Sequence, residues 1–444
     1  MKFDRIVDYL RIGKLLESLH FCFKQRKMHK NTQHIWQPFF NAISATDLRS
    51  LNVMAQNAKL TMVDSNNRLG GLLRPHLPQG NLVMSSYSIA TVLGMLLRGA
   101  KEKSEEQILK AFNAKSEDIQ EGMKQTLGIV QTFKENGNIT LRAANKIYSE
   151  ETFSLLPDYL EDLKRFYSTA PETLSFQKQP EKSRHSINTW VSDQTNQKIK
   201  DLLPEGSITS DARVVLVNAL YFKGDWVHKF DPENTQVEDF HVDKNQRVSV
   251  KMMYQEQKFG LLENIAELDE ANALQMPYKG ENMDMVLVLP HKKSDIVSLE
   301  KQMAKANLSQ VLGSFGPETN VELYLPKFKV ESTLELNKPI QNIGITDIFD
   351  VSKADLSGMT GNKNLYVSTV IQKAFVEVNE EGAEAAAATG AVFMSKSAPM
   401  STVFECNRPF IFLIRERSSG LVLFSGRMIN PLQNWRELKQ NQQS

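Results

Sequence analysis

The sequence predicts a single domain of the α+β class, and three patterns support this prediction. Apolar residues between positions 187 and 202 recur at intervals of three and four, which is the spacing of an amphipathic helix. Residues 214–226 form a near-continuous apolar run, typical of a strand buried on both faces. Residues 407–415 and 421–427 give the pattern of a hairpin. Because no internal repeat or linker divides residues 47–431, we expect one domain over that length.

The composition is that of an ordinary soluble globular chain. Of the 444 residues, 41% are hydrophobic and 24% are charged. The net charge of +1 gives no reason to expect a nucleic-acid or anionic membrane partner. The chain has no run of 18 apolar residues, so the sequence predicts no membrane-spanning helix.

The two ends of the chain are predicted to lie outside the domain. Residues 1–46 form an N-terminal extension, flexible or partly helical, and residues 432–444 form a C-terminal tail. The first 50 residues hold 9 Lys or Arg against 4 Asp or Glu. The basic residues 24–30 are either a polyanion patch or localisation signal, or a solvated tail, which is the favoured interpretation.

The remaining elements follow in chain order. A helix is predicted over residues 47–67, followed by a strand and serine turn over 81–89, a helix over 90–100 and a strand over 139–148. The helix that contains Trp190 is expected to end at Pro204 and Gly206. Strands over 273–280 and 285–290 are expected to pair, and residues 321–329 alternate as one strand. The first helix should present one apolar side, formed by Leu48, Leu51, Met54, Ala58 and Met62.

Residues 377–397 are the most unusual stretch, because nearly every side chain from Gly382 to Ala391 is small. A linker and a short alanine helix are two interpretations, but isolated helices below about 12–15 residues are marginal in water. As a strand, the segment has one face that is apolar or small throughout, and the opposite face begins with Glu384. Such a segment can lie as an exposed loop and also fit into a tightly packed sheet.

This pattern, Glu-Glu-Gly-x-Glu-Ala-Ala-Ala-Ala-Thr, closely resembles the hinge of the reactive centre loop of inhibitory serpins. The resemblance implies a loop at about residues 380–405 that is presented to a serine protease and inserts into the main sheet after cleavage. The family usually has Thr or Ser where this chain has Ala383, which is still small and uncharged. The hinge would consist of Glu380, Glu381, Gly382, Ala383, Glu384, Ala385, Ala386, Ala387, Ala388 and Thr389.

The spacing of the family places the reactive bond between Lys396 and Ser397. Lys396 is the only Lys or Arg between Glu377 and Arg408, so a trypsin-like protease would have one cleavage choice there. The pocket of such a protease carries an aspartate that pairs with a basic side chain.

Other motifs extend the resemblance from about residue 47 to residue 431. Residues 218–226 match the serpin signature Asn-x-x-Tyr-Phe-Lys-Gly-x-Trp. Residues 81–89 resemble the serpin segment that enters the central helix through two serines, except that Ser86 replaces the usual proline between them. In the family, the signature Asn belongs to a hydrogen-bond cluster beneath the point where the sheet opens. A histidine usually joins this cluster at the position of Gln372. Gln372 keeps one hydrogen-bond donor group and one acceptor, but unlike histidine it does not change its charge with pH. The predicted sheet-opening cluster is Ser85, Ser88, Asn218, Gln372 and Trp226.

The resemblance implies one serpin domain with three β-sheets, and a monomer that inhibits trypsin-like serine proteases as a suicide substrate. The alternative is a non-inhibitory serpin acting as a carrier, chaperone or storage protein. An enzyme is not expected, since His-Glu-x-x-His, P-loop, Gly-x-Gly-x-x-Gly and Gly-x-Ser-x-Gly motifs are absent. No cofactor or metal is expected, and residues 116–134 are too poor in basic residues to predict glycosaminoglycan binding.

The compartment is predicted to be extracellular, with the cytoplasm as the alternative. Family habit and two glycosylation sequons, at Asn138 and Asn307, favour secretion, whereas the N-terminus is not a convincing signal peptide. Cys22 and Cys406 form no disulfide framework, and whether either pairs is left open.

Overall fold

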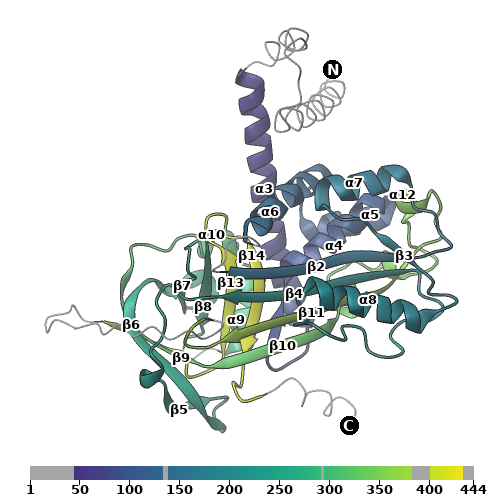
Figure 1. Ribbon diagram of the computed structural model, residues 1–444. Helices are drawn as coiled ribbons and strands as arrows, with labels where there is room; N and C mark the ends of the chain where they lie inside the picture. Colours follow the sequence, from purple (N-terminus) through teal and green to yellow (C-terminus); the bar gives the residue numbers. More distant parts are fainter. Residues whose placement is uncertain (1–44, 134–138, 292–294, 383–400, 434–444) are drawn as a thin grey trace, which may run out of the picture. The chain divides into compact units, whose positions relative to one another are not determined.

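The computed structural model describes residues 45–133, 139–291, 295–382 and 401–433 (Figure 1). The chain divides into two units, residues 1–56 and residues 57–444, and the fold described below belongs to the second. Within the described ranges, no helix is long and apolar enough to cross a membrane.

A five-stranded sheet is the element on which the site is built. Its strands run in the order β10 (Phe328–Glu335), β11 (Val367–Val378), β4 (Val214–Gly224), β2 (Ile139–Glu150) and β3 (Glu172–Leu174). β11 and β4 pair in parallel at the centre, whereas β10 pairs with β11, and β2 with β4, in antiparallel orientation.

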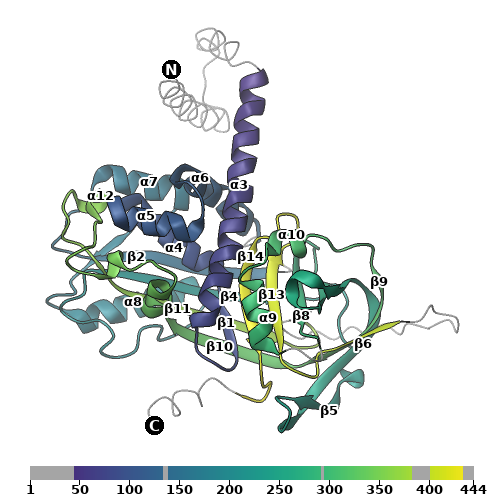
Figure 2. The ribbon, with the colours of Figure 1, turned by 180° about the vertical axis from the view of Figure 1, so that it is seen from behind.

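β4 is buried on both faces, as its apolar run predicts, because helices cover the sheet from two sides. On one side, Val215 and Val217 pack with Ile187 and Val191 of α8 (Pro180–Gln194). On the other side, Leu216 packs into the core that contains α4 (Ser86–Gly99). In Figure 2, which is seen from behind, α4 lies on the near side of the sheet and α8 on the far side. Around α4 lie α5 (Glu102–Phe112), α6 (Ser116–Thr132), α7 (Pro157–Tyr167) and α12 (Ser357–Thr360).

A nine-stranded sheet forms the second layer. Its main path is β1 (Leu82–Met84), β14 (Val422–Met428), β13 (Phe410–Glu416), β8 (Met283–Leu289), β7 (Ala271–Pro277), β6 (Arg247–Ile265), β9 (Thr319–Pro326) and β12 (Thr402–Glu405), and β5 (Gln236–His241) pairs with β6. Residues 260–265 of the long strand β6 pair with β7, and its residues 252–259 pair with β9. Two of the three predicted sheets are therefore joined through one strand.

The remaining helices are short, apart from the first. They are α3 (Ala45–Leu73), α9 (Ile296–Met303), α10 (Leu308–Val311), α11 (Asn337–Asn342) and the 3₁₀ turns η2 (Arg74–His76), η4 (Pro232–Asn234), η5 (Ala266–Leu268) and η6 (Asp347–Phe349). The α+β class and the hairpin of β13 and β14 are confirmed.

Two details of the predicted elements are wrong. The helix of Trp190 ends at Gln194 and not at Pro204, because Asn196 and Gln197 take left-handed backbone angles. The expected strand over 321–329 is broken at Lys327, which lies between the end of β9 and the start of β10. Its backbone N–H donates to the Lys251 carbonyl at 2.8 Å. The predicted first helix is present as α3, and its close packing begins at Ala58, where α6 approaches through Gly122, whereas Met54 is 62% exposed.

Candidate sheet-opening and hinge site

The parallel pairing of β4 with β11, here called the central seam, is where the sheet would have to open. Its register joins residues 214–221 to residues 367–375, with an irregularity between Val367 and Thr369. Asn218 of β4 lies opposite Gln372 of β11 and, on its other side, opposite Asn145 of β2. Three polar side chains therefore stand at one level across β2, β4 and β11.

Gln372 links the central seam to the start of α4. Its Oε1 accepts from the Ser85 N–H at 2.8 Å, and its Nε2 donates to the Ser85 carbonyl at 2.9 Å. The Ser85 hydroxyl oxygen caps α4 by accepting from the Ser88 N–H at 3.1 Å, and the Ser88 hydroxyl donates to Asn145 Oδ1 at 2.8 Å. The structure thus brings together Ser85, Ser88 and Gln372, and adds Asn145.

Asn145 was missed by the sequence reasoning, although a signal was present. It is a polar residue in the middle of the strand pattern over 139–148, directly before Lys146. Its register opposite Asn218 becomes visible only when the two strands are paired.

Asn218 and Trp226 do not share the hydrogen bonds that join Gln372 to Ser85. Asn218 is fully buried, yet among the described residues its side chain makes a single hydrogen bond, from Nδ2 to the Ile371 carbonyl at 3.5 Å, and its Oδ1 has no partner. Trp226 stands beyond the end of β4, outside the cluster. Its indole N–H donates to the Asn379 carbonyl at 3.0 Å, and its ring stacks on Tyr278 at 4.4 Å. Trp226 therefore belongs to the hinge.

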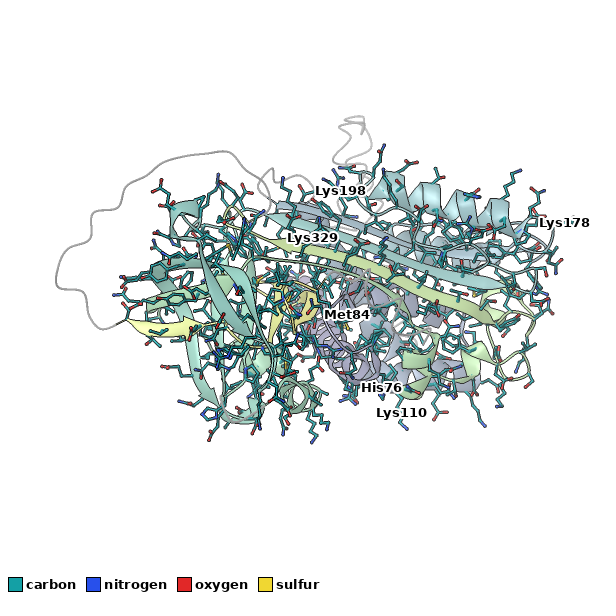
Figure 3. All side chains as sticks on the ribbon, turned by 90° about the horizontal axis from the view of Figure 1, so that it is seen from below. His76, Met84, Lys110, Lys178, Lys198 and Lys329 are labelled. Carbon is teal, nitrogen blue, oxygen red and sulfur yellow. The ribbon has the colours of Figure 1, made fainter. Side chains whose placement is uncertain are left out.

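On the α8 side, aromatic and basic side chains bridge the central seam. Tyr221 of β4 and Phe375 of β11 lie opposite each other and stack with ring centres 6.0 Å apart. Lys198 lies over Tyr221 at 5.8 Å and Lys329 over Phe375 at 4.8 Å, distances at which a cation attracts a ring face. Figure 3 shows both lysines on this side of the sheet and Met84 on the other. The sequence did not predict this bridge.

The hinge begins with a buried acidic anchor. Glu380 is 8% exposed, and its carboxylate accepts from Lys327 at 2.6 Å and from the Thr235 hydroxyl at 2.9 Å. Its carbonyl accepts from the Phe230 N–H at 3.0 Å. Burial alone would raise the pKa of Glu380, but these bonds to the charged form outweigh it and hold the pKa below its ordinary value.

Gly382 closes the described part of the hinge, and only glycine fits there. Its φ of +105° lies in a region that side chains disfavour, and an added Cβ would stand 2.2 Å from the Gly224 carbonyl oxygen. Glu381 pairs with Lys229, and its carbonyl accepts from the Trp226 N–H at 3.2 Å. The chain is thus fixed against β4 up to the point where the small-residue stretch starts.

Several predicted residues lie outside the described residues. These are Ala383, Glu384, Ala385, Ala386, Ala387, Ala388, Thr389, Lys396, Ser397 and Asn138. Asn307 is exposed at the start of α10, where its Oδ1 accepts from the Gln310 N–H at 3.1 Å.

Neither a metal centre nor a disulfide is present in the described part of the chain. No group of three or more His, Cys, Asp or Glu there could hold an ion. Cys406 is a free, fully buried thiol, and burial raises its pKa well above the ordinary value.

The fold and the site together define a class of protein. The profile of the family described as Serpin (serine protease inhibitor) matches residues 67–431, and this chain belongs to that family. The family is one of inhibitors that act on proteases.

The relatives agree with this assignment. The chain is 40% identical over 378 residues to human Serpin B3, covering 80% of this chain and 94% of that protein. It is 37% identical to leukocyte elastase inhibitor of Bos taurus, covering 81% and 95%. Among solved structures, Serpin48 of the insect Tenebrio molitor has a TM-score of 0.70 at 32% identity, covering 85% and 98%. Uncleaved ovalbumin has a TM-score of 0.73 at 29% identity, covering 84% and 100%.

Proposed function

We propose that this serpin inhibits a trypsin-like serine protease as a suicide substrate cleaved at Lys396–Ser397. The observation that carries the proposal is the hinge. A stretch of small residues starts at Gly382, and the chain just before it is anchored beside the central seam. The non-inhibitory alternative would favour bulky or charged residues on the face of the stretch that enters the sheet, whereas here that face carries Ala383, Ala385 and Ala387.

The choice of a trypsin-like target rests on Lys396. The bovine relative is named an elastase inhibitor, a statement about that protein alone. In this chain the presumed bond follows a lysine, which pairs with the aspartate of a trypsin-like pocket.

The mechanism uses the orientation of the strands. The protease serine forms an acyl bond to the Lys396 carbonyl, and Ser397 leaves with the new amino terminus. The freed segment of about thirteen residues spans roughly 40 Å as a strand. Since it turns back at the hinge, it would enter the central seam antiparallel to both β4 and β11. One parallel pairing would be replaced by two antiparallel ones, which are slightly more stable per residue.

The primary test is to mix the protein with trypsin. We expect a covalent complex that resists detergent, and a released C-terminal peptide that begins at Ser397 by mass spectrometry. A peptide with another start would refute the proposed bond. A cleaved protein that forms no complex, and melts at the same temperature as the intact one, would favour the non-inhibitory alternative.

The inserted register is tested by two neighbouring hinge residues. Ala385 would face the packed interior after insertion, where burying an unpaired carboxylate costs roughly several kcal/mol of free energy. Ala386 would face outward. Ala385→Glu should therefore turn the inhibitor into a substrate, and Ala386→Glu should be tolerated far better. Equal ratios of complex to cleaved product for the two variants would contradict this register.

The domain limits of 47–431 and the extracellular location with its cytoplasmic alternative stay predictions. The extracellular location can be tested at Asn307, because this sequon residue is exposed and so is accessible to glycosylation. A glycosidase-sensitive mass at that residue in the native source would support the extracellular location.

A further inference from the structure

A buried group of two arginines and one glutamate, here called the arginine group, joins η2, α9 and β14. Arg427 of β14 donates from Nη1 to both carboxylate oxygens of Glu300 of α9, at 3.0 and 2.9 Å. The other two nitrogens of Arg427 donate to the carbonyls of Gly80 and Pro78. Arg427 is therefore fully partnered, and it occupies both oxygens of Glu300.

Arg74, the first residue of η2, is the third member of the arginine group, and its charge is not balanced. It is 2% exposed, and its Nη1 lies 3.6 Å from Glu300 Oε1, which is an ion pair but too long for a hydrogen bond. Its Nε and Nη1 have no acceptor in the described part of the chain. Burial lowers the pKa of Arg74, and Arg427 lowers it further against the opposing effect of Glu300. Arginine nevertheless stays charged in proteins, so two cations share one carboxylate here.

Arg74 lines a small cavity beside α3, α9 and β14, three elements that Figure 2 shows next to one another. The volume of this cavity is about 10 Å³, which is room for one particle of the size of a water molecule. Gly70 of α3 leaves the space open, since an added Cβ there would stand 3.0 Å from Ser86 Cβ. The cavity is therefore a built feature of the packing between these elements.

Three features make the cavity favourable for an anion. Ser425 of β14 also lines it, and the hydroxyl oxygen of Ser425 is buried without a partner among the described residues. Ser86, another lining residue, is the first residue of α4, where the helix dipole favours negative charge. Arg74 is the one charged residue in the described lining, so no carboxylate there repels an anion.

We propose that this cavity binds one monovalent anion of the size of chloride, which accepts hydrogen bonds from the Arg74 guanidinium and the Ser425 hydroxyl. Buried polar groups and charges are costly unless a protein group, a water molecule or an ion partners them. A water molecule would accept the hydrogen bonds but would leave the excess positive charge in place. Chloride supplies the acceptor and the charge together, whereas sulfate, phosphate and gluconate are too large for a cavity of this volume.

The consequence is a stability that depends on the anion and not on the proposed inhibitory function. Residues of α3, α4, α9 and β14 line the cavity, so an anion there stabilises their packing. A ligand that binds only the folded chain raises its stability as the ligand concentration exceeds the dissociation constant. We expect the melting temperature of the intact protein to rise with chloride in this way.

The test compares the melting temperature of the full-length protein in sodium chloride and in sodium gluconate, at the same concentration and pH. The two salts share their cation and ionic strength, so general screening is the same in both. The wild type should melt about 2–3 °C higher in chloride, as for a ligand present well above its dissociation constant. Sodium bromide should act like chloride, and a crystal grown in it should show the anomalous signal of bromide beside Arg74 and Ser425.

Two variants and a matched control locate the effect. Arg74→Met removes the cation but leaves Arg427 paired with Glu300, so this variant should fold, and its difference in melting temperature between the two salts should fall to near zero. Ser425→Ala should keep part of the difference, since the guanidinium remains. The control is Arg68→Met, because Arg68 also lies on α3 but is exposed, and its difference should equal that of wild type.

Three results would overturn the proposal. An equal melting temperature of the wild type in the two salts would mean that a water molecule partners Arg74. A difference that survives Arg74→Met, or that Arg68→Met removes, would place the anion elsewhere. If Arg74→Met does not fold, the bromide crystal decides, and a structure without the anomalous signal beside Arg74 contradicts the site.

Discussion

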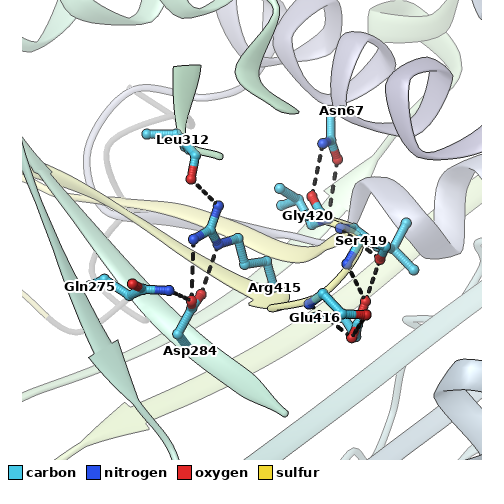
Figure 4. Close-up of polar contacts among 11 residues, drawn as sticks. Asn67, Gln275, Asp284, Leu312, Arg415, Glu416, Ser419 and Gly420 are labelled. Atoms are coloured by element: carbon cyan, nitrogen blue, oxygen red, sulfur yellow. Dashed lines mark hydrogen bonds and ion pairs between the residues drawn. The ribbon is translucent and has the colours of Figure 1, made fainter. Parts of the chain in front are cut away.

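The two sheets differ in how their polar groups are held, and the difference indicates which part of the molecule is built to move. In the nine-stranded sheet, Arg415 donates to both carboxylate oxygens of Asp284, at 2.8 and 3.2 Å, and to the Leu312 carbonyl at 2.6 Å (Figure 4). Gln275 also donates to Asp284. A second buried group joins Arg427 and Arg74 to Glu300.

The central seam of the five-stranded sheet has no such ion pair crossing it among the described residues. On the α4 side, its buried polar groups are neutral amides and hydroxyls, and Asn218 Oδ1 lacks a partner among the described residues. The buried Lys373 of β11 pairs with Glu331 of β10 at 3.0 Å, away from the seam. Buried ion pairs fix one geometry, since breaking them leaves an uncompensated charge. Neutral hydrogen bonds can be exchanged at a smaller cost. We infer that the nine-stranded sheet holds its geometry and that the central seam yields.

The largest effect should come from breaking the Arg415–Asp284 pair. Arg415→Ala leaves the fully buried carboxylate of Asp284 without its cation, which should lower the free energy of unfolding by about 3–5 kcal/mol. Urea unfolding measures this. Arg417→Ala is the matched control, because Arg417 makes a 3.8 Å pair with the exposed Glu281 and should cost less than about 1 kcal/mol. Similar losses for the two variants would mean that burial does not distinguish them.

A smaller loss is expected at the central seam from Gln372→Leu. This change leaves the buried N–H of Ser85 without its partner, at a cost of about 1–3 kcal/mol, whereas the Ser85 carbonyl still accepts from the Ile89 N–H at 3.2 Å. Gln372→His keeps one donor and one acceptor and should cost less. A loss from Gln372→Leu as large as that from Arg415→Ala, in the same urea titration, would remove the contrast between the two sheets.

The sequence was sufficient for the parts of the fold that depend on apolar pattern. β4 could be predicted because its run is apolar on both faces, and the β13–β14 hairpin because two such runs flank a turn. The end of α8 could not, because the left-handed residues Asn196 and Gln197 are polar and continue an apparently helical pattern. The break at Lys327 was hidden because the alternation continues across it, into a strand of the other sheet.

The site divides in the same way. Ser85, Ser88 and Gln372 were named through the resemblance, and the structure places them in contact. Asn145 and the stack of Tyr221 on Phe375 depend on register across strands far apart in sequence, which no local pattern contains. Trp226 was assigned to the sheet-opening cluster, whereas its contacts lie at the hinge.

The anchor at Glu380 gives a pH-dependent prediction. Its folded pKa is depressed, so its contribution is present above the ordinary value of 4.5 and is lost as the pH falls through the folded value. At pH 7, Glu380→Gln should cost about 1 kcal/mol, since Lys327 is partly exposed. The difference in melting temperature between wild type and this variant should shrink as the pH is lowered below about 4. The control, Glu377→Gln, changes an exposed 3.7 Å pair with Lys329 and should show no such trend.

The smallest effect on intact stability should come from Asn218→Val. The change removes one 3.5 Å hydrogen bond, which destabilises the protein. It also removes a buried oxygen that has no partner among the described residues, which stabilises the protein, so the two effects nearly offset each other. We expect the free energy of unfolding to change by less than about 1 kcal/mol.

The informative readout is the cleaved protein. A strand inserted beside β4 would bring new donors close to Asn218 Oδ1, so the wild type should gain a partner on insertion that the valine variant cannot use. The gap in melting temperature between intact and cleaved protein should therefore be smaller for Asn218→Val than for wild type. A loss above about 2 kcal/mol in the intact variant would mean that Asn218 already holds the closed sheet together. The central seam would then be a locked element like the Arg415–Asp284 pair, and the contrast between the two sheets would fail.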